Sequence, residues 1–334
     1  MIGRFGGKWQ ASISKMKRKI GLIVGREGTF PQAFIDRVNE LSVEGITAEF
    51  VKLGGTQMAE ESPYGCIVDR ISHEVKYYRG YLKTAALAGT YIINNPFWWS
   101  ADDKFFNYSV ASRLGVAVPR TILLPSKSYP PDIWPESLRN LVYPLDWDAI
   151  VEHVGLPAIL KPFEGGGWKS VYKVNSKDEL IRAFDETGEL CMTLQQFVHF
   201  QHYVRCFCFG KESITPVKYD PHNRRYLVEH AHLSSELGER IVRDAQTLNR
   251  ALGYDMNTVE FAIEDGVPYA IDFLNPAPDM DRHSITEFYF SEVVERMARL
   301  AIDRTLSGTF QDMQPRWPEM VGLTSDDFRL AIGD

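Results

Sequence analysis

Two lysines flank a glycine-rich stretch in the middle of the chain, and this stretch is the first candidate for chemistry. An apolar run ends in Lys161, the glycines Gly165, Gly166 and Gly167 follow, and Lys169 comes two residues later. Glycines adopt positive φ readily and, having no Cβ, let backbone N–H groups approach anionic oxygens closely. A lysine at the end of a buried strand needs an anionic partner. The stretch therefore predicts two strands joined by a flap that lies against a polyphosphate; the alternative is an ordinary hairpin with a glycine-rich turn.

A Walker-type phosphate loop does not fit these residues. That motif needs a glycine directly before the Lys-Ser pair and a helix after it. Here Trp168 precedes Lys169, and the residues that follow Ser170 have the apolar and aromatic character of a strand.

The second candidate is a pair of acids on a predicted hairpin near the end of the chain. We expect Ile263 to face Val267 across a three-residue turn, which makes Glu260 and Asp272 diagonal neighbours on one face. Two carboxylates so placed can share a hard cation, and Asn275 can add a carbonyl oxygen. A turn of even length would place the acids on opposite faces. The alternative is a pair of solvated strand acids.

Composition narrows the class of protein. The 334 residues carry a net charge of −7, which argues against sequence-independent nucleic-acid binding. No apolar run approaches the roughly 18 residues of a membrane-spanning helix. The basic N-terminal residues lack the apolar segment of a secretory signal, so we expect an N-terminal arm. Four cysteines are too few for a disulfide framework, and we expect a cytoplasmic protein.

Strand-like and helix-like segments alternate from residue 19 to residue 95, which predicts a small, mostly parallel, Rossmann-like α/β domain. Glycines stand at only two positions of a G-x-G-x-x-G fingerprint, Gly25 and Gly28, and Pro31 follows shortly after them. A dinucleotide site is therefore not expected in this domain.

The order of motifs from about residue 90 to about residue 305 resembles the ATP-grasp superfamily, and in particular its branch of ribosomal-protein glutamate ligases and glutathione synthetases. The matching segments are Asp103-Lys104, Gly115 to Thr121, Ile159 to Pro162 with the three glycines, Gln195 to Val198, Tyr203 to Phe207, and the acids with Asn275. The resemblance implies an α/β and α+β protein, in which two α+β subdomains clamp ATP and a small Rossmann-like domain precedes them.

The resemblance also implies a division into segments: an arm (1–18), a pre-ATP-grasp α/β domain (19–95), a flap subdomain with a connector (96–190), a C-terminal subdomain with the metal site (191–310) and a peripheral tail (311–334). It further implies roles for individual residues. Those expected to bind ATP are Lys104, Lys161, Gly165, Gly166, Gly167, Gln196, Phe197 and Val198. Those expected to hold Mg²⁺, with Mn²⁺ as an alternative, are Glu260, Asp272 and Asn275. Arg205 and Lys169 are expected to act in catalysis, Arg205 on acyl-phosphate or carboxylate oxygens and Lys169 on the γ-phosphate.

The implied activity is an ATP- and Mg²⁺-dependent ligase that joins a carboxylate to an amine through an acyl phosphate. The expected partners are small-molecule or peptide acids and amines, without nucleic acid or membrane, and a homodimer is an open alternative. Three departures from the family stand out: Gln196 replaces its usual glutamate, Tyr203 its usual aspartate, and Asp272 is separated from Asn275 by one extra residue. They leave open a nucleotide-binding regulatory module without turnover.

Overall fold

The computed structural model describes residues 17–58, 60–97, 103–164, 169–229 and 231–322. The predicted arm up to residue 16 and the three flap glycines, Gly165, Gly166 and Gly167, lie outside the described residues. The chain divides into two compact units. The first holds residues 1–93 with 293–311, and the second holds residues 94–292 with 312–334.

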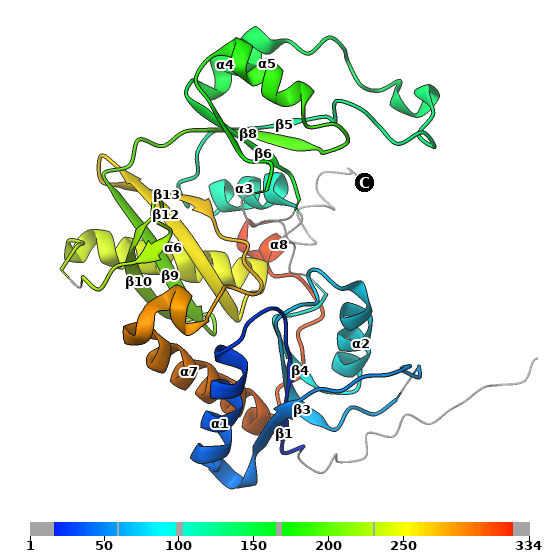
Figure 1. The fold of residues 1–334 in the computed structure, drawn as a ribbon, viewed down its shortest axis with the longest axis vertical. Coiled ribbons are helices and arrows are strands. Elements are labelled where there is room, and N and C mark those ends of the chain that lie inside the picture. Colours follow the sequence, from blue (N-terminus) through cyan, green and yellow to red (C-terminus); the bar gives the residue numbers. More distant parts are fainter. Residues whose placement is uncertain (1–16, 59, 98–102, 165–168, 230, 323–334) are drawn as a thin grey trace, which may run out of the picture. The chain divides into compact units, whose positions relative to one another are not determined.

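The first unit is built on a parallel sheet. Its strands are β1 (Lys19–Ile23), β2 (Thr47–Phe50), β3 (Tyr64–Asp69) and β4 (Tyr91–Ile93), in the order β2-β1-β3-β4. Helix α1 (Phe30–Leu41) and the C-terminal half of α7 (Arg282–Ser307) cover one face, and α2 (Lys76–Leu87) covers the other (Figure 1). A 3-10 turn, η1 (Val43–Gly45), precedes β2. Because helices cover both faces, the two central strands β1 and β3 are mostly apolar and buried, and the predicted parallel α/β domain is confirmed.

The larger sheet of the second unit is antiparallel. It consists of β9 (His202–Phe209), β10 (Ser213–Asp220), β11 (Arg225–Tyr226), β12 (Met256–Glu264) and β13 (Val267–Asp272), in the order β11-β10-β9-β12-β13. Its apolar face packs on α6 (Ser235–Leu252) and α3 (Lys104–Arg113). The thiols of Cys206 and Cys208 belong to this core, as small buried hydrophobes. The opposite face, which carries Tyr203, Arg205 and Glu260, is called the polar face below.

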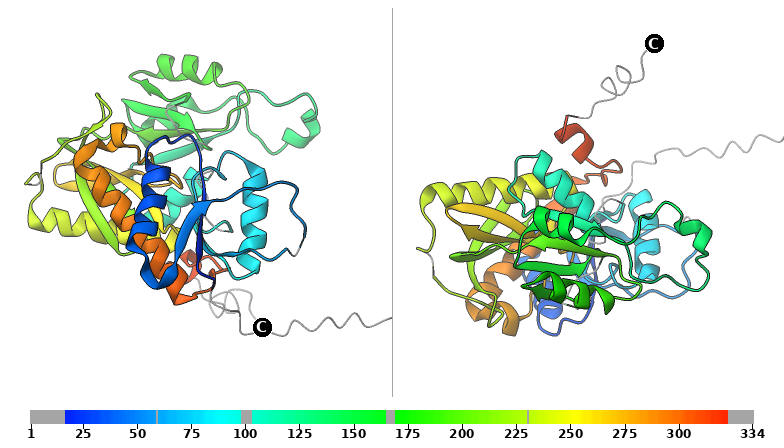
Figure 2. Two further views of the ribbon diagram at one scale, coloured as in Figure 1. Left: turned by 60° about the horizontal axis from the view of Figure 1, so that its bottom comes forward. Right: turned by 90° about the horizontal axis from the view of Figure 1, so that it is seen from above.

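The smaller sheet of the second unit carries the residues on either side of the glycine flap. It consists of β5 (Thr121–Leu124), β6 (Ala158–Pro162), β7 (Tyr172–Val174) and β8 (Met192–Gln196), in the order β5-β8-β6-β7. Helices α4 (Trp147–Val154) and α5 (Lys177–Asp185) lie together on one of its faces (Figures 1 and 2). The short helices η2 (Pro135–Leu138) and α8 (Trp317–Met320) lie outside the sheets. The two predicted strands that flank the flap, β6 and β7, are paired antiparallel.

Side-chain caps fix where the helices begin. Asp103 accepts a hydrogen bond from the Phe106 N–H and so places Lys104 at the first position of α3. Ser234 caps α6 in the same way, and Gly253 ends that helix with φ 76°. Helix α7 is interrupted at Thr286, where φ is 70°. Of the helices described, none is both long and apolar enough to cross a membrane.

Candidate functional site

The turn between β12 and β13 differs from the prediction. Glu264 faces Val267, so only Asp265 and Gly266 form the loop, and their φ angles are 49° and 75°. A two-residue Asp-Gly turn with positive φ at both positions matches the right-handed twist of the strands it joins. The expectation of a three-residue turn, with Ile263 opposite Val267, was therefore wrong.

A β-bulge restores the arrangement that the shorter turn would have lost. Phe261 faces Ala270, but the register then shifts and Glu260 faces Asp272, so that Ile271 is the extra residue on β13. Without this shift, a turn of even length would put the two acids on opposite faces. The bulge places Asp272 directly across from Glu260, closer than the diagonal position predicted.

The carbonyl of the bulge residue Ile271 accepts two hydrogen bonds from outside its own hairpin. One comes from the buried hydroxyl of Tyr108 on α3, and the other comes from the ammonium of Lys161 on β6, at 3.2 Å. A phenolic hydroxyl has one proton, so the lone pairs of Tyr108 remain for Lys161, whose Nζ lies 2.9 Å away. These contacts tie the predicted phosphate lysine to β13, the strand that ends in the predicted metal ligand Asp272.

Lys161 has a third acceptor, the side-chain oxygen of Gln195 on β8, at 2.9 Å. An ammonium has three protons, and Tyr108, Gln195 and the Ile271 carbonyl account for all of them. All three acceptors are neutral, whereas the sequence predicted an anionic partner. Lys161 therefore keeps its positive charge uncompensated by these contacts, which suits a site for an anion.

Glu260 is held by two partners on the polar face. The Tyr203 hydroxyl donates to Oε2, and Arg205 Nε lies 3.0 Å from Oε1. Burial raises the pKa of Glu260 above its ordinary value, although Arg205 opposes that shift. Burial and the neighbouring carboxylate of Glu260 also raise the pKa of Tyr203. The Tyr203 hydrogen bond and the charge of Lys161 also lower the pKa of Glu260, whereas Asp272 raises it.

Arg205 lies among aromatic rings. Its guanidinium carbon is 4.7 Å from the centre of the Tyr219 ring and 5.4 Å from that of Tyr226. Burial opposes the charge of Arg205, but Glu260 and the surrounding tyrosines outweigh burial and raise its pKa. Arg205 Nε makes no hydrogen bond among the described residues, so its contact with Glu260 is an ion pair. These contacts fix the plane of the guanidinium.

The other predicted ATP residues are spread over the second unit. Lys104 is buried at the start of α3, where its backbone N–H donates to the Phe163 carbonyl at 3.4 Å. The side chain of Gln196 accepts a hydrogen bond from Arg120 Nε at 3.1 Å. Lys173 Nζ lies 3.9 Å from the centre of the Phe197 ring.

Val198, predicted to bind ATP, and Lys169, predicted to act in catalysis, lie in different surroundings. Val198 is buried against Tyr203 and Ala262, which makes it a packing residue of the polar face. Lys169 lies exposed in the turn that leads from the flap into β7, next to Ser170 with φ 53°.

No protein-family model matches the sequence. A curated D-alanine–D-alanine ligase of Polynucleobacter asymbioticus is 26% identical over 160 residues, which are 42% of this chain and 47% of that protein. The chain thus matches about half the length of that relative.

Solved structures match over much more of the chain. The RimK domain protein ATP-grasp of Sphaerobacter thermophilus has a TM-score of 0.60 at 16% identity, covering 86% of this chain and 99% of its own. A D-alanine–D-alanine ligase of Bacillus anthracis complexed with ATP has a TM-score of 0.59 at 18% identity, with coverages of 87% and 97%. The VanG D-Ala:D-Ser ligase of Enterococcus faecalis has a TM-score of 0.61 at 14% identity, with coverages of 86% and 99%.

The chain has the ATP-grasp fold. This confirms the fold predicted from the order of the motifs. At identities below 20% the likeness concerns the backbone, so the chemistry has to be argued from the residues themselves.

The fit of a divalent cation to this ATP-grasp chain depends on three side chains. Asp272 is exposed, and Asn275 donates through Nδ2 to Thr258 Oγ1 at 2.9 Å, which leaves its carbonyl oxygen as the group for a ligand. Both oxygens of Glu260 have partners, but a carboxylate offers about four lone-pair sites. No group of three His, Cys, Asp or Glu side chains that could hold a metal occurs in the described part of the chain. Glu260, Asp272 and the carbonyl oxygen of Asn275 nevertheless fit Mg²⁺, because this ion takes one or two carboxylates and completes its shell with phosphate and water.

Sequence reasoning missed two residues of this site. Tyr108 lies four residues after Lys104, one helical turn along α3, and that spacing was the available signal for a second side chain on the same helix face. Gln195 precedes the predicted hinge residue Gln196, and strand alternation directs the two side chains to opposite faces. Gln195 contacts Lys161 and Thr121.

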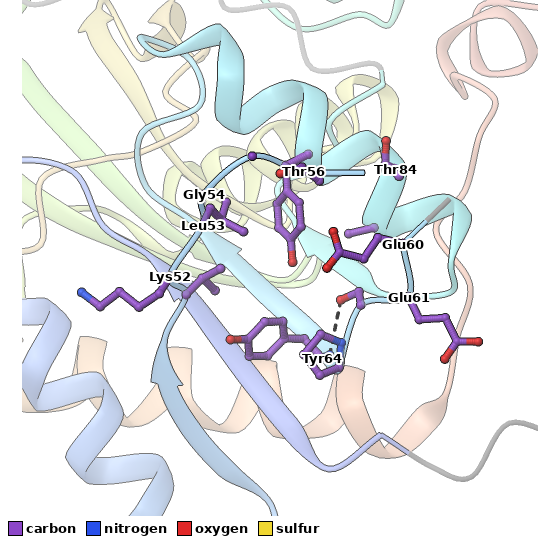
Figure 3. A pocket seen from close by; sticks show the side chains of 14 residues that line it. Lys52, Leu53, Gly54, Thr56, Glu60, Glu61, Tyr64 and Thr84 are labelled. Carbon is purple, nitrogen blue, oxygen red and sulfur yellow. Dashed lines mark hydrogen bonds between the residues drawn. The ribbon is translucent and has the colours of Figure 1, made fainter. Parts of the chain in front are cut away.

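A cavity of about 220 Å³ lies in the first unit, between the segment after β2 and helix α2 (Figure 3). In Figure 3 the Glu60 carboxylate points into the cavity, whereas Lys52 and Glu61 point away from it. None of the residues predicted to bind ATP or Mg²⁺ lines it.

Proposed function

We propose that this chain is an ATP- and Mg²⁺-dependent ligase that joins a carboxylate to an amine through an acyl phosphate and releases ADP and phosphate. The observation that carries the proposal is the contact of Lys161 with the Ile271 carbonyl. This contact holds the Lys161 ammonium, to which we assign phosphate binding, at the residue before Asp272, to which we assign the metal. The D-alanine–D-alanine ligase and the ATP complex among the similar proteins support the same reaction class.

Binding of the nucleotide would draw on the charge of Lys161. Its three protons already have neutral acceptors, so an incoming phosphate oxygen has to replace at least one of them. A charge-assisted hydrogen bond is roughly twice as strong as a neutral one, which favours the exchange. Lys104 and the flap lysine Lys169 would add positive charge on the α/β- and γ-phosphates.

Asp272, Asn275 and Glu260 would hold the metal. A bound Mg²⁺ would supply positive charge against the negative charge that develops during phosphoryl transfer. The protein's part is to orient this set of oxygens. The bulge brings Asp272 across from Glu260, and Arg205 with Tyr203 fixes the direction of the Glu260 carboxyl group.

Arg205 was predicted to act on acyl-phosphate or carboxylate oxygens, and we retain that role as a proposal. Its ion pair with Glu260 and the rings of Tyr219 and Tyr226 hold the guanidinium in one plane, as bidentate recognition of such oxygens requires. The acids and amines would be small molecules or peptides. A solved ATP-grasp ligase, PsnB, is complexed with a precursor peptide and matches this chain with a TM-score of 0.57 at 15% identity.

A screen of acid and amine pairs for ADP release, with Mg²⁺ and ATP present, tests this function. Asp272→Asn keeps the shape of the side chain and removes its charge, so any genuine activity should be lost in that variant. The matched control is Asp265→Asn in the exposed β12–β13 turn, outside the site, which should keep full activity. ADP release that persists in Asp272→Asn would contradict the proposed role of this residue.

A second candidate is a nucleotide-binding regulatory module without turnover. Two observations favour it: the protons of Lys161 are fully used by the protein, and both oxygens of Glu260 already have partners. Under this alternative, Mg-ATP raises the melting temperature of the chain, but no acid and amine pair releases ADP. Amine-dependent ADP release would exclude it.

A further inference from the structure

The side chain of Gln195 links three adjacent strands of the smaller sheet. Gln195 lies on β8, directly across from Thr121 on β5, and its other neighbour is β6, which carries Lys161. It is 3% exposed, and its amide contacts both the Thr121 hydroxyl and the Lys161 ammonium. The orientation of this buried amide decides which of its two ends Lys161 meets.

Hydrogen-bond partners fix that orientation from both ends. Thr121 Oγ1 donates its only proton to the Pro119 carbonyl at 2.9 Å, because a carbonyl oxygen can only accept. Toward Gln195 the hydroxyl can therefore only accept, and it lies 3.0 Å from Nε2. At the other end the ammonium of Lys161 can only donate, and it meets the amide oxygen at 2.9 Å. The hydrogen bonds thus run in one direction, from the ammonium to the Pro119 carbonyl.

Strand β8 also fixes the backbone of Lys161. Thr193 lies directly across from Lys161, and strand alternation puts its side chain on the same face as that of Gln195. Thr193 is fully buried, and its hydroxyl donates to the Lys161 carbonyl at 3.2 Å. Two side chains on one face of β8 therefore hold the lysine, one at its backbone and one at its head group.

The head group of Lys161 keeps its charge in these contacts, because all three of its hydrogen-bond acceptors are neutral. Glu260 acts on Lys161 electrostatically, but its carboxylate is paired with Arg205 at 3.0 Å. A carboxylate in the place of the Gln195 amide would accept the same hydrogen bond and cancel the charge. The amide gives the ammonium a fixed position without that loss.

We propose that Gln195, oriented by Thr121, is a positioning residue that holds the Lys161 ammonium for a phosphate group of the nucleotide and leaves its charge uncompensated. This inference rests on the proposed function. Glutamate has nearly the same shape as glutamine but would compete with the phosphate for the ammonium. Methionine has a similar length but no comparable acceptor. The two substitutions therefore separate the charge at position 195 from its hydrogen bonds.

Mg-ATP binding to the full chain, measured by titration calorimetry without acid or amine, tests this role. Gln195→Glu should weaken binding about tenfold, because a phosphate oxygen then competes with a carboxylate for the same ammonium. Gln195→Met loses both hydrogen bonds but leaves the charge, so it should weaken binding by about threefold. A purely structural role predicts the opposite order, since methionine removes more contacts. The melting temperature of each variant without nucleotide reports whether it is folded.

The salt dependence of binding is a readout that packing alone would not move. Salt screens the attraction between the phosphates and Lys161. Added sodium chloride should therefore weaken binding to the wild type more than binding to Gln195→Glu, in which the charge is already cancelled. The matched control is Gln57→Glu, in the exposed segment between β2 and β3 of the first unit. It makes the same change in net charge and should bind Mg-ATP as the wild type does at every salt concentration.

Thr121 supplies a second, independent test. Thr121→Val keeps the shape of the side chain but removes the acceptor of Gln195 Nε2, so the amide loses its fixed orientation and binding should weaken about threefold. Thr121→Ser restores a hydroxyl and should bind Mg-ATP as the wild type does. This pair tests the proposal even if Gln195→Glu does not fold.

The proposal is overturned if Gln195→Glu binds as tightly as the wild type or keeps its salt dependence, if Gln195→Met loses as much affinity as Gln195→Glu, or if the two Thr121 variants bind alike. None of these results depends on turnover. ADP release by a chain whose Gln195 variants bind normally would keep the proposed function and remove the role of Gln195. The predicted order of affinities without any ADP release would do the reverse. A wild type that does not bind Mg-ATP would remove both.

Discussion

The ion pair between Arg205 and Glu260 offers the sharpest test of how the polar face is held together. The perturbation is Arg205→Met, which keeps an unbranched apolar side chain between Tyr219 and Tyr226 and removes the charge. Glu260 then keeps its hydrogen bond from Tyr203 but loses the cation 3.0 Å from its other oxygen. Burying an unpaired carboxylate is costly, so the fold should lose stability.

The expected loss follows from the burial of the pair. Breaking a buried ion pair by removing one partner costs about 3–5 kcal/mol in unfolding free energy. The two side chains are 17% and 15% exposed, so some screening by solvent remains. We therefore expect the lower end of that range, about 3 kcal/mol, at pH 8.

The loss should depend on pH with a defined sign. Burial already raises the pKa of Glu260, and removal of Arg205, which opposes that shift, should raise it further. A carboxyl with a raised pKa in the folded state binds more protons there than in the unfolded chain. The unfolding free energy of the variant therefore falls as pH rises from the unfolded pKa to the folded one, by up to about 1.4 kcal/mol per pH unit.

The assay is urea unfolding followed by circular dichroism at several values from pH 5 to pH 8. Glu260→Gln in the Arg205→Met background removes the unpaired charge, so it should recover most of the loss and abolish the pH slope. The control is Lys127→Met, which breaks an exposed ion pair with Asp185 and should cost less than about 1 kcal/mol at every pH. A loss in Arg205→Met that is independent of pH, or as small as in the control, would refute the reasoning.

Three further changes test the remaining contacts. Lys161→Met should weaken Mg-ATP binding about tenfold or more, measured as a smaller thermal shift than in the wild type; an equal shift would count against its role. Asp272→Asn should abolish ADP release while the ATP-induced thermal shift persists, and Asn275→Ala should reduce turnover less; the reverse order would contradict the assigned ligands. Tyr108→Phe removes one hydrogen bond from the Ile271 carbonyl and should cost about 1–2 kcal/mol, with faster amide exchange at Asp272; unchanged exchange would mean that the bulge does not depend on this hydroxyl.

The sequence was sufficient for the fold because its signals are local and follow one another in a fixed order. The alternation of apolar strands and amphipathic helices predicted the parallel sheet of the first unit, which β1 to β4 form. Lys161 before the flap and the acids on the last hairpin predicted which strands would carry the candidate site. Such patterns need only the period of a strand or helix and the types of the residues.

The relation of Glu260 to Asp272 could not be obtained in this way. The sequence predicted a three-residue turn, and the turn has two residues; the acids nevertheless share a face because of the bulge at Ile271. A bulge costs ladder hydrogen bonds, and only its surroundings decide whether it forms. Those surroundings are Tyr108 and Lys161, which lie 163 and 110 residues away along the chain.

The charges on the polar face show the same limit. Arg205 and Glu260 could each be assigned a separate role from their residue types, one on the substrate and one on the metal. Their pairing at 3.0 Å, with Tyr203 on the other oxygen, depends on the register of β9 against β12. The sequence by itself determined the fold and the kinds of groups available for chemistry. The tertiary structure decided which of them meet, because burial and strand register act between residues that local patterns cannot connect.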